Sequence, residues 1–214
     1  MASISCLCRA CYTSADHTAQ IYAVDCLTMC LITEECQFPA DVWIDCFDQL
    51  LLPLIRSEAE PEIVVRITNM VCKILLHRLP SMLEYPNLPS FWTRFISAMT
   101  SAALRDNNDE LICTHMQESL KNVILVVAHM HFPLDCTIER NELLKSTFDL
   151  LNEHNSLQDF CETIGQELED NDRQEQTAPI VDIKQDVSAE CLTALYEGDG
   201  IMDADKRFEH TSIN

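Results

Sequence analysis

The 214-residue sequence contains little glycine and few aromatic residues: three Gly, and 7% Phe, Trp and Tyr together. β-Sandwiches and β-barrels need turn residues at short intervals, so this shortage disfavours both folds. Hydrophobic residues still make up 47% of the chain, which is enough to build a core and excludes disorder of the whole chain. The composition therefore predicts an α-helical protein.

Basic residues are also scarce, because 14 Lys and Arg stand against 35 Asp and Glu, a net charge of −21. A protein this acidic repels phosphate backbones, so we expect no nucleic-acid partner. The acidity is concentrated near the end of the chain, where residues 158–214 hold 15 acidic and 4 basic side chains. Little apolar patterning accompanies it. We predict an α-helical repeat domain at residues 1–168 and an acidic, mostly disordered tail at residues 169–214.

No apolar run approaches the roughly 18–20 residues that a membrane-spanning helix needs. Residues 1–10 lack the basic start and apolar stretch of a secretory signal. Twelve cysteines would suit a small disulfide-rich secreted domain, but most of them lie in helical apolar patterns, where free Cys behaves as a small buried hydrophobe. We expect a reduced, cytoplasmic protein without a transmembrane segment.

Apolar residues recur at helical spacing in successive blocks that short breaks separate. Pro53 lies inside one of these blocks, so a kink or a distorted turn is expected there. Helical pairs of roughly 40 residues are typical of HEAT and armadillo proteins. The predicted fold is all-α, a HEAT/armadillo-like helical hairpin solenoid with a disordered acidic C-terminal tail. A compact helical bundle is the alternative, since periodicity does not separate the two.

Sequence patterns typical of catalytic or cofactor sites are missing: there is no G-x-S-x-G, no phosphate-binding glycine loop and no H-E-x-x-H. Six cysteines near the N-terminus could be imagined as a zinc cluster, but they lack the paired knuckles of zinc sites, and Cys6 and Cys8 would point to different helix faces. We expect no metal, no cofactor and no catalytic residue. The spacing of Trp43, Phe47, Phe91, Trp92 and Phe95 predicts core aromatics, and that of Asp41, Asp45 and Asp48 a solvated helix face.

Two stretches of the sequence are more specific. Residues 43–54 read W-I-D-C-F-D-Q-L-L-L-P-L. The second stretch begins at Phe91-Trp92, includes Met99, and continues at residues 117–126 as Q-E-S-L-K-N-V-I-L-V. Both resemble the C-terminal helical region of the large Golgi brefeldin A-resistance guanine-nucleotide exchange factors for Arf GTPases. The upstream segment, residues 7–31, is similar to the helical repeat that precedes this block in the family.

The resemblance covers roughly residues 4–132, and E-S-L-K-N at residues 118–122 is its most specific part. It implies an α-solenoid. It also implies that this chain is not an enzyme, because the family's catalytic exchange domain normally lies upstream and nothing in this sequence matches it. The positions that match the family motifs, in a structural or an interaction role, are Trp43, Cys46, Phe47, Pro53, Trp92, Met99, Glu118, Ser119, Leu120, Lys121 and Asn122.

The function that the resemblance implies is a C-terminal regulatory or targeting module of a Golgi Arf exchange factor, peripheral to the Golgi and acting in vesicle trafficking. Its partners would be proteins of the Arf pathway or Golgi recruitment factors, because the acidic surface disfavours attraction to lipid. The chain would then be a fragment, a truncated gene product or a divergent paralogue. The alternatives are an independent helical-repeat adaptor that binds a partner helix, and a helical enzyme with a Cys nucleophile.

Overall fold

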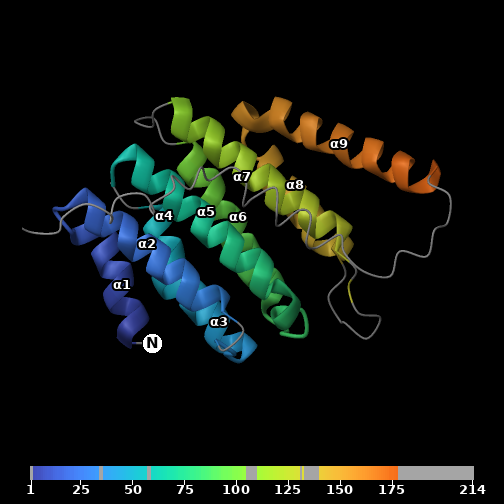
Figure 1. Ribbon diagram of the computed structural model, residues 1–214. Helices are drawn as coiled ribbons and strands as arrows, with labels where there is room; N and C mark the ends of the chain where they lie inside the picture. The colour runs from blue at the N-terminus through green and yellow to red at the C-terminus, as the bar shows by residue number, and fades with distance from the viewer. Residues whose placement is uncertain are drawn as a thin grey trace, which may run out of the picture. The chain divides into compact units, whose positions relative to one another are not determined.

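The computed structural model describes residues 2–33, 36–56, 59–104, 110–130, 132 and 140–177. All regular elements within these ranges are helical, which confirms the predicted all-α class (Figure 1). In chain order they are α1 (Ala2–Thr13), α2 (His17–Ile32), α3 (Ala40–Cys46), the π-helical turn η1 (Phe47–Leu51), α4 (Leu52–Ile55), α5 (Pro61–Arg78), the 3₁₀ turn η2 (Leu79–Met82), α6 (Leu88–Ala103), α7 (Glu110–His129), α8 (Arg140–Asn152), the 3₁₀ turn η3 (Asn155–Leu157) and α9 (Gln158–Thr177).

The helices lie in two rows. In the first row α2 packs against α5, α5 against α7, and α7 against α9. In the second row α1 contacts η1 and α4, α4 contacts α6, and α6 contacts α8. Pairs that follow each other in the chain, such as α1 with α2 and α6 with α7, join the rows (Figure 1). The described chain therefore consists of successive helical hairpins, each packed on the next.

Pro53 distorts the helix in which it lies, as the sequence predicted. Proline has no backbone N–H and its ring clashes with the carbonyl group four residues earlier. The chain avoids this clash by widening into the π-helical turn η1, at whose end the backbone N–H of Leu52 donates to the carbonyl oxygen of Phe47. The short helix α4 then carries Pro53 in its first turn.

The predicted aromatic core is confirmed. Trp43, Phe47, Phe91, Trp92 and Phe95 are all at most 1% exposed. The rings of Phe47 and Phe91 lie 5.3 Å apart between centroids and join η1 to α6, which belong to different hairpins. Aromatic contacts therefore help to fix how one hairpin stacks on the next.

The last helix is longer than the sequence analysis expected. The predicted repeat domain ended at residue 168, whereas α9 continues to Thr177. Residues 169–177 are strongly polar but contain neither Gly nor Pro, so nothing in them breaks a helix. The remainder of the predicted acidic tail, residues 178–214, lies outside the described residues.

Candidate functional site

The first family motif forms part of the core. Trp43, Cys46 and Phe47 are buried. The Arg78 guanidinium at the end of α5 lies 4.8 Å from the Trp43 ring centroid, within the range of a cation–π contact. Its Nη2 donates to the carbonyl oxygens of Leu31 and Thr33, each at 2.7 Å. The motif therefore ties together the end of α2, α3 and the end of α5, which is a structural role.

The tryptophan of the second motif joins two hairpins. Trp92 on α6 is fully buried, and its Nε1–H donates to Oγ1 of Thr147 on α8 at 2.7 Å. The Thr147 hydroxyl in turn donates to the carbonyl oxygen of Leu143 at 2.8 Å. Met99, two turns further along the same face of α6, is also fully buried. Trp92 therefore joins α6 to α8, and Met99 belongs to the core.

The E-S-L-K-N motif lies in the middle of α7, and its side chains point in different directions around the helix. Leu120 points into the core and is 1% exposed. Ser119 Oγ lies 3.4 Å from Nε2 of His115. The same nitrogen lies 3.0 Å from Oδ1 of Asn69 on α5. Asn122 is half-buried. The motif thus fixes α7 against α5 on one side.

Lys121 connects the same motif to the last helix. Its Nζ lies 3.1 Å from Oε2 of Glu118 and 3.3 Å from Oε1 of Glu167 on α9. The hydrogen bond with Glu118 raises the pKa of Lys121 above its usual value, and the hydrogen bond with Glu167 raises it further. Burial of the ammonium group acts in the opposite direction and lowers the pKa. Among the predicted motif residues, Glu118 and Pro53 are the exposed ones, and the others are buried or half-buried.

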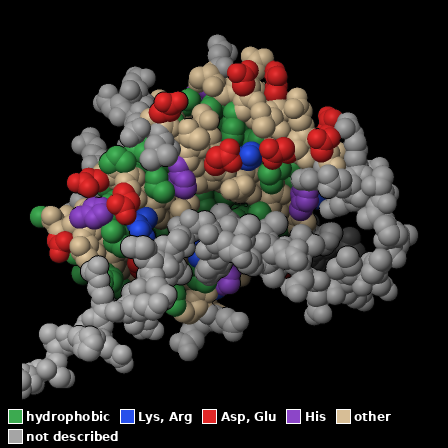
Figure 2. Space-filling view, turned by 45° about the horizontal axis from the view of Figure 1, so that its top comes forward, with side chains coloured by type: hydrophobic (Ala, Val, Ile, Leu, Met, Phe, Trp, Pro, Cys, Tyr) green, Lys and Arg blue, Asp and Glu red, His purple; other side chains and the backbone are tan. Residues whose placement is uncertain are grey.

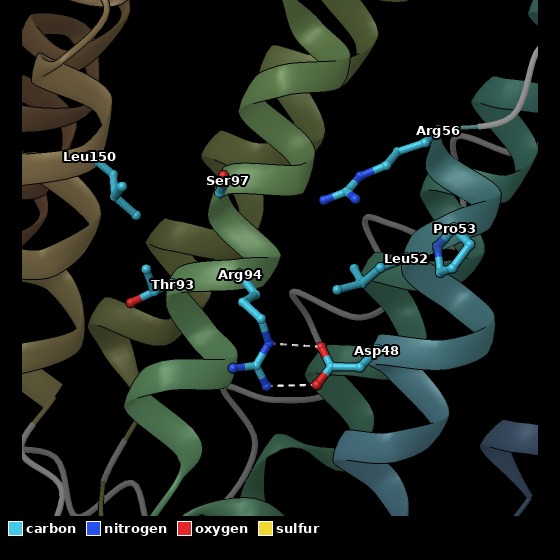
Figure 3. A pocket seen from close by; sticks show the side chains of 8 residues that line it. All are labelled: Asp48, Leu52, Pro53, Arg56, Thr93, Arg94, Ser97 and Leu150. Carbon is cyan, nitrogen blue, oxygen red and sulfur yellow. Dashed lines mark hydrogen bonds and ion pairs between the residues drawn. The ribbon is translucent and has the colours of Figure 1, made fainter.

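Pro53 borders the surface pocket that is the candidate binding site (Figure 3). The pocket has a volume of about 510 Å³ and lies between the η1–α4 segment, α6 and α8. Three elements of the second row of helices therefore contribute to one surface. Its lining consists of Asp48, Leu52, Pro53, Arg56, Thr93, Arg94, Ser97 and Leu150.

The two arginines of the pocket have different surroundings. Arg94 forms a two-pronged ion pair with Asp48, with Nε 3.0 Å from Oδ1 and Nη2 2.6 Å from Oδ2, and these bonds raise the pKa of Arg94. Arg56 is exposed and pairs with no described carboxylate. Its side chain extends from the end of α4 toward α6 (Figure 3). The pocket can therefore offer an incoming acidic group the charge of Arg56 beside the polar side chains of Thr93 and Ser97.

The sequence analysis missed this pocket. It assigned Asp41, Asp45 and Asp48 to a solvated helix face. Asp41 and Asp45 are exposed as predicted, whereas Asp48 is half-buried and forms an ion pair with Arg94. The two residues are 46 positions apart, and no local pattern relates them. Pro53 is the motif position that lines this pocket, and nothing in the sequence indicates that it lies beside Thr93 and Ser97.

A second pocket, of about 470 Å³, lies beside Trp43. Gln37, Phe38 and Ser81 contribute to its lining together with Arg78. Arg78 is buried, and its Nε and Nη2 already donate to two backbone carbonyl oxygens, so its charge is less open to a ligand than that of the exposed Arg56. We therefore regard the pocket at Arg56 as the better binding site.

The cysteines of the described residues are free thiols. Cys6 is exposed and Cys8 buried, as the prediction of different helix faces requires. Burial raises the pKa of Cys8, Cys46 and Cys72 to about 12. A nucleophilic cysteine needs a lowered pKa, so these thiols are unsuited to catalysis.

The described residues offer neither a candidate metal site nor a candidate membrane span. Their His, Cys, Asp and Glu side chains form no group of three or more that could hold a metal ion. None of the helices in these ranges combines the length and the apolar character needed to cross a membrane.

Residues 1–157 match the model of a protein family described as GBF1-like, tetratrico peptide repeat region. The match includes the whole segment in which the motifs resemble the Golgi exchange factors, and that resemblance is thereby confirmed. The family is described as a repeat region and not as a catalytic exchange domain. The description of the family names tetratricopeptide repeats, whereas the periodicity of the sequence favoured repeats of the HEAT and armadillo type. Comparisons with curated proteins and with solved structures gave no match.

Proposed function

This chain belongs to the GBF1-like family of tetratrico peptide repeat regions, and on that premise we propose that it is a regulatory or targeting module of a Golgi Arf exchange factor. It acts at the periphery of the Golgi by binding a protein partner, and its contribution to Arf activation is recruitment rather than nucleotide exchange. The observation that carries the proposal is the family match over residues 1–157.

The architecture supports a binding role. Helical hairpins that pack one on the next are the units of an α-solenoid, and here α1–α2 packs on α4–α5, which packs on α6–α7. We propose that the stack is such a solenoid. Such stacks present an extended surface made of many hairpins, on which partners bind. The Arg56 pocket lies on such a surface, since its lining comes from the second, third and fourth hairpins of the described chain.

Charge supports a protein partner with an acidic anchor. The face in Figure 2 carries many acidic side chains and few basic ones, in keeping with the net charge of −21. Such a surface repels anionic lipid, and most acidic proteins as well. Arg56 is a local exception beside a pocket, so we propose that a Glu or Asp side chain of the partner enters the pocket and pairs with it.

Recruitment can be measured by expressing the tagged full chain in cells and determining the fraction that sediments with Golgi membranes. We expect Arg56→Glu to lower this fraction severalfold, because it replaces the attraction at the pocket by repulsion. Lys145→Glu is the matched control, since it makes the same charge change at an exposed position of α8. Equal Golgi fractions for Arg56→Glu and the unchanged chain would contradict the role of the pocket. A chain that binds partners but never sediments with Golgi membranes would favour the independent adaptor instead.

A separate experiment tests the absence of exchange activity. We expect the purified chain, added to Arf loaded with fluorescent GDP, to leave the rate of nucleotide release unchanged, because the family match covers a repeat region. A Golgi exchange factor that contains its catalytic domain serves as the positive control. A clear acceleration by the chain alone would overturn the assignment as a recruitment module.

A further inference from the structure

The guanidinium of Arg78, the last residue of α5, is a buried positive charge. Only 7% of the residue is exposed. Its Nε and Nη2 both donate to the carbonyl oxygen of Leu31, and Nη2 also donates to that of Thr33. These bonds use three of the five N–H groups of the guanidinium. They pair the charge with backbone dipoles and not with an opposite charge.

No acidic side chain of the described residues neutralises this charge. The ion pairs formed within the described ranges do not include Arg78. The nearby thiol of Cys36 does not supply a negative charge either, because burial raises its pKa and the attraction of Arg78 only partly offsets this effect. The contact with the Trp43 ring is a cation–π interaction and leaves the net charge in place. Since buried charges in proteins are normally paired with an opposite charge, Arg78 has the surroundings of an incomplete site.

The unused nitrogen of Arg78 is open to the second pocket. Nη1 takes part in none of the three hydrogen bonds that hold the guanidinium. The fully enclosed side-chain atoms that lack a hydrogen bond in the described chain are Oγ1 of Thr100 and Nδ1 of His129. Because Nη1 is not one of them, it is accessible, and the pocket of about 470 Å³ is the cavity that Arg78 lines.

The other residues of this pocket complement a negative group. We call the cavity lined by Gln37, Phe38, Trp43, Arg78 and Ser81 the Arg78 pocket. Gln37 and Ser81 are exposed, and their side chains can donate hydrogen bonds. None of the five lining residues is acidic, although the whole chain carries a net charge of −21. The volume of the pocket lies within the range of roughly 300–1,000 Å³ that is usual for small-molecule sites.

We propose that the Arg78 pocket binds the carboxylate of a small organic acid, which pairs with Nη1 of Arg78 and accepts hydrogen bonds from the side chains of Gln37 and Ser81. A singly charged group fits better than a phosphate, because one guanidinium neutralises one charge and the acidic chain repels a second. A free small acid fits better than a side chain of a folded partner, because the residue that it must reach is almost completely buried. This site is separate from the Arg56 pocket and does not depend on recruitment to the Golgi.

The first test is a titration of the full chain with acetate at constant ionic strength, followed by tryptophan fluorescence. Trp43 reports on the pocket because its ring lies 4.8 Å from the Arg78 guanidinium, whereas Trp92, the other tryptophan, is fully buried between α6 and α8. We expect a saturable change with acetate and severalfold weaker binding of sulfate. No saturable change with acetate would overturn the proposal. A change with a blocked glutamate peptide but not with acetate would also overturn it, in favour of a side chain of a partner.

The second test uses Gln37→Glu, which places a carboxylate in the pocket with almost no change of shape and leaves the hydrogen bonds of Arg78 to α2 intact. We expect this variant to bind acetate roughly tenfold more weakly and to unfold at a higher urea concentration, because it supplies the missing negative charge. Gln166→Glu, the same substitution at an exposed position of α9, should leave acetate binding unchanged. Undiminished acetate binding by Gln37→Glu would overturn the proposal. So would an unchanged urea midpoint, because Arg78 would then already have an acidic partner, such as Glu34 or Glu35, which lie outside the described residues.

Discussion

Replacing Leu120 by Asp is expected to lower the free energy of unfolding by about 3–5 kcal/mol, because it buries a charge that has no partner. Leu120 is 1% exposed and lies on α7 among the buried side chains of Met116, Val123 and Ile124. The neighbouring Lys121 could not compensate the new carboxylate, since it is already paired with Glu118 and Glu167.

Urea unfolding followed by circular dichroism measures this change as a lower midpoint at an unchanged slope. Thr114→Asp is the matched control, because Thr114 is an exposed residue of the same helix, and a surface substitution should change stability by no more than about 0.5 kcal/mol. If Leu120→Asp unfolded at the same urea concentration as the unchanged chain, the placement of the E-S-L-K-N motif against the core would be wrong.

Trp92→Ala is expected to cost about 3–5 kcal/mol, the usual range for removing a large aromatic side chain from a core. Trp92 is fully buried and bridges α6 and α8 through its hydrogen bond to Thr147. Trp92→Phe keeps most of the buried area and loses the indole N–H, so about 1–2 kcal/mol is expected for that variant. The Thr147 hydroxyl would still donate to Leu143.

A double-mutant cycle separates the hydrogen bond from the packing. Combining Trp92→Phe with Thr147→Val should give a coupling energy of about 0.5–1.5 kcal/mol in urea unfolding, the usual net value of one hydrogen bond. Additive effects of the two substitutions would show that this bond contributes nothing. A Trp92→Ala variant as stable as the unchanged chain would contradict the role of this residue in joining the hairpins.

Local features of the fold could be predicted well because their causes are local. Few glycines, apolar residues at helical spacing and Pro53 inside a block were enough to predict helices and the distortion at η1. The aromatic residues were correctly placed in the core for the same reason, since a large apolar side chain on a helical face is buried in most proteins. The end of α9 was missed because polar residues without Gly or Pro can form either a helix or a loop.

The candidate site could not be predicted because its parts come from distant segments. Asp48 meets Arg94 across 46 residues, and Arg56 gains its importance from Thr93 and Ser97 on another helix. The E-S-L-K-N motif drew attention to α7, where Ser119 reaches α5 through His115 and Lys121 pairs with Glu167 on α9. Motif resemblance identified the family, and it did not identify the binding surface.

The sequence by itself determined the helical class, the helical spacing of the apolar residues and the family to which the chain belongs. These depend on spacing within about one or two helical turns, or on short runs of residues, and both are readable along the chain. Only the tertiary structure decided which side of each helix is covered. Residues 22–30 contain apolar side chains on both faces of α2. The packing of α1 and α5 against this helix leaves Tyr22 and Met29 exposed.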